Sequence, residues 1–316
     1  MTSLDPSATL VRALAPEPFD AFEVLAATLP GGAPARPLEL ARRRIAVLLD
    51  GEADSLAPIA ELDPQDTDAL ASWPTSLRYD TVDRAVLELS EQFVVDVAAT
   101  SEEQRKRCLG DLGDRAFAAV EAVYVLDHGL RIRAALRQIF GVAEPVRRPE
   151  PVGASGGPRV ELWDALQNWM RAVALLDALD PLTTELVRLR GARTHDCRLC
   201  RSMRNVHAVR SGADESTFDQ IDDYENSDLS ERHKVVLRLT DAMLRQPTAY
   251  PVGLVEQVHM YLTPAESLEV VLDVARNATN KIAVAFGADE AHVSEGVEFY
   301  DFDPYGDVVH GVRLEP

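Results

Sequence analysis

Two cysteines and the residues around them carry the clearest chemical signal in this sequence. Cys197 and Cys200 form a Cys-x-x-Cys pair, and Thr194 or Asp196 just before them can serve as the N-cap of a helix. Helix N-termini, nearby arginines and Cys-x-x-Cys geometry each lower the pKa of a thiol from about 8.5, and the thiolate is the reactive form of cysteine. The segment therefore predicts a redox-active dithiol, which requires sulfur atoms that solvent can reach.

One continuous helix through this segment would bring further groups beside the cysteines. At about 100° per residue, Cys197, Cys200, Arg204 and His207 fall on one stripe, and Gly212 lies where the helix would end. Arg204 can hold a thiolate by charge, but it cannot accept a proton because its pKa stays above about 12.

Other interpretations of the cysteine pair remain open. The two residues could be small buried side chains on a helix, and with His207 they could supply three zinc ligands. No second Cys-x-x-Cys and no His-x-x-x-His is present to complete a zinc set, so we expect neither a metal nor a bound cofactor. Cys108, the third cysteine, has no visible partner and is expected to be a free thiol.

Composition limits the class of protein. The chain has 316 residues, 46% of them hydrophobic and 27% charged, as in globular proteins. A formal net charge of -20 argues against binding nucleic acid or an anionic membrane. With three cysteines, no secretory signal pattern and no long apolar run, a cytoplasmic location is expected.

The remaining pattern predicts an all-α chain with a short β-hairpin near its end. Asp180 before Pro181 signals a helix start, and Thr263 with Glu266 forms a capping box ahead of a long helix that ends at Gly287. Residues 143–158 are rich in proline and glycine and are expected to be a linker. Residues 288–316 form the tail, in which 303–306 has the composition of a hairpin turn.

The two halves of the chain resemble each other. Residues 39–44 resemble 185–190, and residues 139–141 match 285–287, both 146 positions apart. This predicts two tandem helical repeats, residues 1–142 and residues 159–287. The first repeat lacks the cysteine pair, because Gly51 and Asp54 occupy the corresponding positions.

A known family shows the same arrangement of residues. Glu185, the Cys-x-x-Cys pair that begins twelve residues later, and Asn277-x-x-Asn280-Lys281 in a helix closing at Gly287 resemble the carboxymuconolactone decarboxylase and alkylhydroperoxidase-D-like family. The resemblance covers about residues 181–287 and, more weakly, 37–141. It implies an all-α homo-oligomer that reduces small-molecule peroxides and is regenerated by a thioredoxin-like or lipoyl thiol donor.

The resemblance also implies roles for individual residues. Cys200 would attack the peroxide, Cys197 would resolve the intermediate, and Glu185 would take part in a proton relay. Peroxidase members carry a histidine four residues after the second cysteine, where this chain has Arg204. The nearest histidines are His207 and His195, so the base would have to be Glu185 or His207.

Two functions from other classes remain as alternatives. One is a non-redox enzyme of the decarboxylase type, which would act on a small cyclic acid in a basic pocket built from Arg204 and Lys281. The other is a non-catalytic oligomerising or binding protein.

Overall fold

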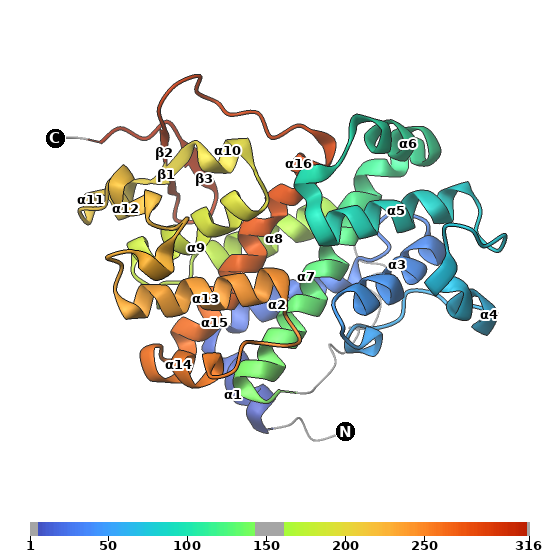
Figure 1. The fold of residues 1–316 in the computed structure, drawn as a ribbon, viewed down its shortest axis with the longest axis horizontal. Coiled ribbons are helices and arrows are strands. Elements are labelled where there is room, and N and C mark those ends of the chain that lie inside the picture. The colour runs from blue at the N-terminus through green and yellow to red at the C-terminus, as the bar shows by residue number, and fades with distance from the viewer. Residues whose placement is uncertain (1–5, 143–160, 315–316) are drawn as a thin grey trace.

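The computed structural model describes residues 6–142 and 161–314. The predicted linker at 143–158 lies outside the described residues. Helices dominate the rest, as the sequence predicts (Figure 1). Their bounds are α1 Pro6–Leu14, α2 Pro16–Ala27, α3 Ala35–Leu48, α4 Pro64–Asp68, α5 Thr81–Asp96, α6 Glu102–Leu112, α7 Ala116–Phe140, α8 Leu162–Ala174, α9 Pro181–Thr194, α10 Arg198–Arg201, α11 Val206–Arg210, α12 Glu215–Asp219, α13 Glu231–Arg245, α14 Leu254–Tyr261, α15 Pro264–Asn277 and α16 Lys281–Phe286.

Several helix ends lie where local chemistry places them. Asp180 accepts a hydrogen bond from the backbone of Thr183 at the start of α9, with proline in the first helical position. Thr263 and Glu266 form the predicted capping box of α15. Gly287 ends α16 in the left-handed conformation, which glycine adopts without steric cost. These sequence predictions are confirmed.

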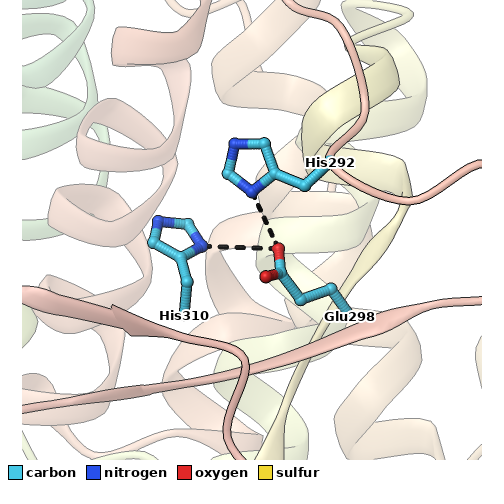
Figure 2. Close-up of side chains that lie close together, drawn as sticks. All are labelled: His292, Glu298 and His310. Carbon is cyan, nitrogen blue, oxygen red and sulfur yellow. Dashed lines mark hydrogen bonds and ion pairs between the residues drawn. The ribbon is translucent and has the colours of Figure 1, made fainter.

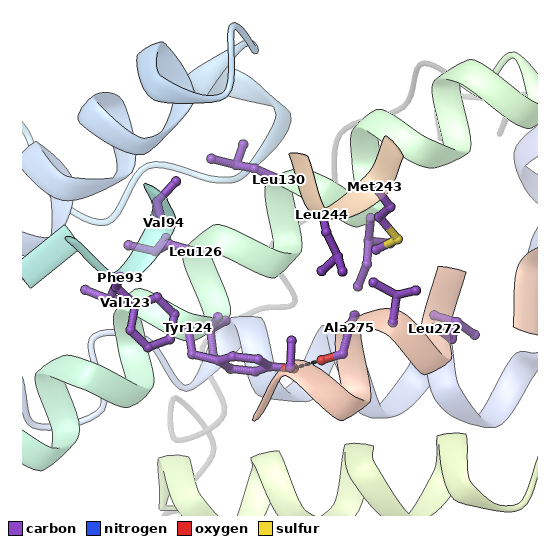
Figure 3. Close-up of a cluster of buried hydrophobic side chains, with 14 of the residues drawn as sticks. Phe93, Val94, Val123, Tyr124, Leu126, Leu130, Met243, Leu244, Leu272 and Ala275 are labelled. Carbon is purple, nitrogen blue, oxygen red and sulfur yellow. Dashed lines mark hydrogen bonds between the residues drawn. The ribbon is translucent and has the colours of Figure 1, made fainter. Parts of the chain in front are cut away.

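The largest of three hydrophobic clusters among the described residues runs through both halves of the chain. It includes buried residues from α1 to α16, and α7 is buried along most of its length. Figure 3 shows α5 and α7 from the first half packed with α13 and α15 from the second. Tyr124 of α7 donates a hydrogen bond of 2.7 Å to the backbone carbonyl of Ala275 in α15. The halves therefore share one interior, and the mutual packing of α7 and α15 holds them together.

A small three-stranded sheet covers one side of the second half. Its strands are β1 Met203–Asn205, β2 Glu298–Phe302 and β3 Val308–His310. The antiparallel pairing of β2 with β3 confirms the predicted hairpin. The parallel pairing of β1 with β2 was not predicted, because three residues between two short helices give no sequence signal for a strand. Through this pairing the tail lies directly against the segment that follows the cysteines.

Two helices that the sequence pattern predicts as continuous are interrupted. The expected long helix from Thr263 to Gly287 is divided by a 3₁₀ turn at 278–280 into α15 and α16. The expected helix through the cysteine segment becomes α10, β1 and α11. Within residues 6–142 and 161–314, none of the helices combines the length and the apolar character that crossing a lipid bilayer requires.

Candidate functional site

The cysteine pair lies at the beginning of a single helical turn. Helix α9 ends at Thr194, and Asp196 then takes a left-handed conformation with φ of 48°, which turns the chain before α10. Cys197 is the N-cap of α10, where its sulfur accepts a 3.2 Å hydrogen bond from the backbone N–H of Cys200. The prediction of Thr194 or Asp196 as the N-cap is wrong, because the chain turns after both residues and the helix begins later.

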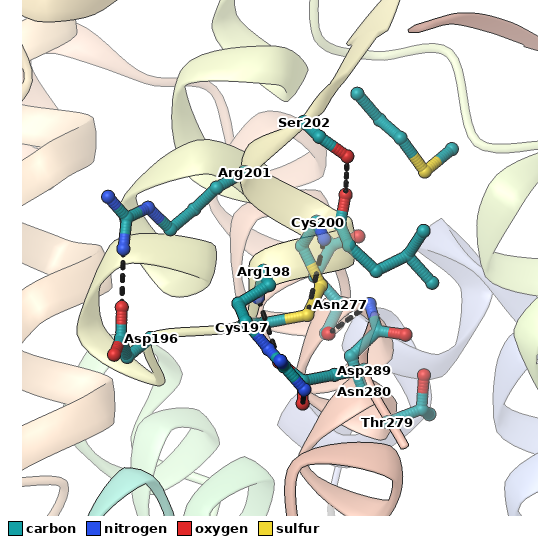
Figure 4. Close-up of a disulfide and its surroundings, with 12 residues drawn as sticks. Asp196, Cys197, Arg198, Cys200, Arg201, Ser202, Asn277, Thr279, Asn280 and Asp289 are labelled. Carbon is teal, nitrogen blue, oxygen red and sulfur yellow. Dashed lines mark hydrogen bonds and ion pairs between the residues drawn. A yellow bond between two sulfur atoms is a disulfide. The ribbon is translucent and has the colours of Figure 1, made fainter. Parts of the chain in front are cut away.

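The two sulfur atoms are joined in a disulfide, drawn with its surroundings in Figure 4. Cys197 is 1% exposed and Cys200 is 4% exposed. The pair is thus close enough to cycle between dithiol and disulfide without moving the backbone far. The access to solvent that a redox function requires is absent from this conformation.

The segment after α16 covers the start of α10. The Asp289 carboxylate accepts a 2.8 Å hydrogen bond from the backbone N–H of Arg198 and pairs with the Arg198 guanidinium, while its carbonyl accepts from the N–H of Leu199. Burial alone would raise the pKa of Asp289, but the hydrogen bonds from Arg198 outweigh it and lower that pKa. A fixed carboxylate therefore occupies the helix N-terminus at which the sequence pattern predicts a thiolate.

Glu185 lies close to the cysteine segment but reaches it through another side chain. Its carboxylate forms a two-pronged ion pair with Arg188, with N–O distances of 2.6 and 2.7 Å. Arg188 also donates to the backbone carbonyls of Cys200 and Met203, at 2.7 and 2.6 Å. Glu185 is 1% exposed and Arg188 is 8% exposed. The pair therefore anchors the backbone that carries Cys200.

Two further residues complete the hydrogen bonding of Glu185. Tyr300 of β2 donates its hydroxyl to one carboxylate oxygen at 3.0 Å, and the backbone N–H of Asn205 donates to the other at 3.2 Å. The guanidinium of Arg188 lies over the ring of Tyr300, 5.3 Å from its centre. Both oxygen atoms of this carboxylate therefore already accept hydrogen bonds, which favours a structural role for Glu185.

Arg204 and His207 are held away from the disulfide by other carboxylates. Arg204 pairs with Glu215 at 2.6 Å and donates to backbone carbonyls at the end of α10. His207 is exposed and pairs with Asp301 of β2 at 3.1 Å. The stripe predicted to contain both residues and both cysteines does not form, because β1 separates Arg204 and His207 from the turn that holds Cys200.

Arg204 and Lys281, the two cations expected to build a basic pocket, are each paired with a separate carboxylate. Lys281 is buried and donates to Asp127 of α7 at 2.8 Å, and Asp127 also pairs with Arg131 at 2.7 Å. Burial lowers the pKa of Lys281 to about 8, opposed by the negative charge of Asp127. This cluster joins the two halves of the chain.

His195 lies at the C-terminal end of α9, two residues before Cys197. Burial lowers the pKa of His195 well below its usual 6.5, and the positive charge of Lys281 adds to this effect. The imidazole is therefore neutral near pH 7, and its surroundings oppose protonation.

An open pocket of about 380 Å³ lies beside the end of α15. Its walls include the apolar side chains of Phe117, Trp163 and Phe286, together with Arg276, Asn277 and Asn280. The two asparagines also belong to the surroundings of the disulfide in Figure 4. The Nδ2 of Asn277 is buried and has no hydrogen-bond partner among the residues that the structure describes. The pocket therefore has apolar walls and is lined in part by asparagines that also belong to the surroundings of the disulfide.

Sequence reasoning missed the residues that hold the segment in place. Arg188 is one turn after Glu185, and an i, i+3 pair of this kind is a readable signal. Tyr300 and Asp289 come from the tail and give no signal, since nothing local relates them to a segment about 100 residues earlier.

Comparison with known proteins shows sequence similarity over most of the chain. The uncharacterized protein Rv2313c of Mycobacterium tuberculosis (strain ATCC 25618 / H37Rv) is 40% identical over 233 residues, which cover 72% of this chain and 80% of the relative. The uncharacterized protein MT2376 of strain CDC 1551 / Oshkosh matches with the same values. This chain belongs to their family. No family model and no solved structure matches it. Because both relatives are uncharacterized, membership in their family assigns no activity to this chain.

Proposed function

We propose that the chain is a thiol–disulfide oxidoreductase that uses Cys197 and Cys200 to reduce a hydroperoxide or a disulfide. The observation that carries the proposal is the bond between the two sulfur atoms at the first turn of α10. A chain of three cysteines has joined the two at Cys-x-x-Cys spacing and left Cys108 buried and free. The resemblance to the carboxymuconolactone decarboxylase and alkylhydroperoxidase-D-like family belongs to the same proposal.

The reaction begins from the reduced pair. The Cys200 thiolate attacks the outer oxygen of the hydroperoxide, the O–O bond breaks, and an alcohol leaves with a proton taken from solvent or a nearby acid. Cys200 is then a sulfenic acid, and the Cys197 sulfur displaces its oxygen as water to form the disulfide. Two electrons pass from the pair to the peroxide. A thioredoxin-like or lipoyl dithiol donates two electrons to restore the thiols.

In this scheme Glu185 and Arg188 are positioning residues. Arg188 holds the carbonyl of Cys200, and Glu185 fixes the Arg188 side chain. Both groups are held within an ion pair, so neither is free to carry the proton. Burial keeps His195 neutral near pH 7 but also disfavours its protonated form, so it is a weak base, and the proton of the attacking thiol passes to solvent rather than to Glu185 or His207, the two bases that the sequence favoured.

We infer that the segment around Asp289, which is hydrogen-bonded to the start of α10, moves to give access to the sulfur atoms. Its contacts with α10 are a few hydrogen bonds and one ion pair with Arg198, which is itself partly exposed. Interactions of this kind open at low cost compared with unfolding. The pocket beside Asn277 then supplies apolar walls for the organic part of a hydroperoxide or for a lipoyl arm.

We propose further that the two halves are repeats of one ancestral unit. In the first half Glu39 forms a buried ion pair with Arg42 at 2.7 Å, and Arg42 donates to the carbonyl of Leu56 at 3.0 Å. The Glu185 and Arg188 pair has the same layout 146 positions later, with Cys200 and Met203 as acceptors. The repeat boundaries 1–142 and 159–287, a homo-oligomeric state and a cytoplasmic location complete the proposal.

A structural disulfide in a non-catalytic oligomerising or binding protein is the second candidate. It is favoured by the burial of both sulfur atoms and by the ion pairs that engage Glu185, Arg204 and His207. The decarboxylase alternative has less support, because Arg204 and Lys281 are each paired with a separate carboxylate.

The oxidoreductase and the structural disulfide predict different results in an assay of peroxide consumption. Reduced protein is mixed with cumene hydroperoxide and a dithiol donor, and consumption of the peroxide is followed for wild type, Cys200→Ser and Cys108→Ser. We expect Cys200→Ser to abolish turnover and Cys108→Ser to retain it, because burial raises the pKa of the Cys108 thiol to about 11 and keeps it unreactive. Equal activity of wild type and Cys200→Ser would contradict the proposal.

A further inference from the structure

Three side chains in the tail lie close together and take no part in the redox chemistry proposed for the cysteine pair. They are His292 in the loop after α16, Glu298 in β2 and His310 in β3, shown in Figure 2. The Nδ1 of His292 lies 2.9 Å from Oε2 of Glu298, and the Nδ1 of His310 lies 3.5 Å from the same oxygen. One possible ligand atom from each residue lies within 4.8 Å of the others.

These distances suit a shared metal ion. Imidazole nitrogen and carboxylate oxygen bind Zn²⁺ at about 2.1 Å, so two ligand atoms in a tetrahedral arrangement lie about 3.4 Å apart. The two nitrogen–oxygen separations fall on either side of that value. Both imidazoles are exposed, whereas Glu298 is only partly so. The side chains therefore need only small rotations to close around an ion, and the fourth position would open to water.

Backbone contacts hold two of the three residues close together without a metal. Tyr300 pairs with His310 across the antiparallel ladder, and the N–H of Glu298 donates to the carbonyl of Ser202 at 2.8 Å. The imidazole rings meet edge to face, with their centres 4.9 Å apart. Two ligands thus come from neighbouring strands of a sheet, which is the rigid support that a preformed metal site needs.

We propose that His292, Glu298 and His310 form a site for a divalent transition-metal ion, with Zn²⁺ as its first occupant. Two imidazoles and one carboxylate are the ligand set of open zinc sites, which keep one position for water. The proposal is independent of the redox function. A metal here would link the loop at His292 to β2 and β3 and so fasten the tail against the cysteine segment.

The test is the binding of zinc alone to the full-length, untagged chain. Protein is stripped with a chelator, kept in its disulfide form so that Cys197 and Cys200 cannot bind metal, and titrated with ZnCl₂ by calorimetry. We expect one ion per chain for wild type. Because loss of a mere supporting contact weakens metal binding about 10- to 100-fold, replacing a ligand in Glu298→Gln or His310→Ala should weaken it by at least about 100-fold.

The control is Glu295→Gln, which removes the same charge from an exposed position in the same tail. It should bind zinc as wild type does. Circular dichroism and the thermal midpoint without metal establish that each variant is folded. A wild-type chain that takes up no zinc at about 0.1 mM, or a Glu298→Gln variant that binds as tightly as Glu295→Gln, would overturn the site and leave a histidine–carboxylate cluster only.

Discussion

The Tyr300 hydroxyl donates to the Glu185 carboxylate at 3.0 Å, which joins the C-terminal sheet to the helix that precedes the disulfide. Both side chains are buried. The carboxylate in turn holds Arg188, and Arg188 holds the backbone of Cys200. The tail is therefore connected to the cysteine turn by a continuous chain of hydrogen bonds.

Removing the Tyr300 hydroxyl should weaken the whole assembly. In Tyr300→Phe the carboxylate of Glu185 loses a buried hydrogen bond, and bonds to charged groups contribute about 1.5–3 kcal/mol. We expect the free energy of unfolding in urea to fall by about that amount. Tyr305→Phe, which alters an exposed tyrosine in the hairpin turn, serves as the control and should change little. Equal behaviour of the two variants would show that the Tyr300 bond contributes nothing.

Breaking the Glu185–Arg188 pair should be costly and should also alter the cysteines. Leaving one charge of a buried pair without its partner destabilises a protein by about 3–5 kcal/mol. Glu185→Gln and Glu39→Gln both do this, because Glu39 holds Arg42 in the same way in the first half.

Only Glu185→Gln should change the chemistry, because only Arg188 contacts the carbonyl of a cysteine. Reaction of the reduced pair with hydroperoxide is compared in the two variants under conditions where both are folded. If Glu39→Gln slows the reaction as much as Glu185→Gln, the positioning role assigned to Glu185 is wrong.

Asp289 should suppress the reactivity of the reduced pair. Its carboxylate occupies the N-terminus of α10 and engages Arg198, so both the helix dipole and the cation that follows Cys197 in the chain are partly neutralised. In Asp289→Asn, alkylation of the reduced cysteines should become faster, and the midpoint of its pH profile should move down by about half a unit to one unit. Asp307→Asn removes a carboxylate paired with Arg171 elsewhere in the tail and should leave the profile unchanged.

Asp273 should make the protein less stable as the pH rises. Burial raises the pKa of Asp273 from 3.8 to about 8, with repulsion from Glu269 as the second cause. Between those pKa values the folded protein holds a proton that the unfolded chain has released, so the free energy of unfolding falls as pH rises through this window. In Asp273→Asn that part of the pH dependence should disappear. Urea midpoints at about pH 5 and pH 8 measure it.

The control for this experiment is Asp228→Asn, an exposed aspartate in the loop before α13. It should follow the wild-type pH dependence. If the urea midpoint changes by the same amount between the two pH values in wild type and in Asp273→Asn, the buried carboxyl does not titrate in this range.

The sequence predicts the parts of this fold that local chemistry determines. Asp180, the Thr263 capping box and Gly287 lie at the expected helix ends because each satisfies backbone groups of its own helix. The interruption after Cys200 could not be predicted in this way. It depends on β2 pairing with β1 from almost 100 residues away, and no periodicity within the segment encodes that partner.

In the candidate site, too, the sequence predicts the features that are local and not those that depend on tertiary contacts. The bond between Cys197 and Cys200 lies at a spacing that the sequence displays, and Glu185 lies in the same region as expected. The partners of Arg204 and His207, by contrast, depend on α12 and on the tail. Long flexible side chains pair with whichever carboxylate the tertiary fold brings near, which a helical stripe does not reveal.

The most direct test of the redox proposal is the reduction potential of the Cys197–Cys200 disulfide in the folded, full-length chain. The protein is equilibrated in thiol buffers of graded potential, quenched with an alkylating agent and weighed by mass spectrometry, while circular dichroism reports the fold. A working redox pair should be reduced reversibly at a midpoint above about −300 mV with the fold retained. A disulfide that stays oxidised below that potential, or yields only when the chain unfolds, would contradict the account.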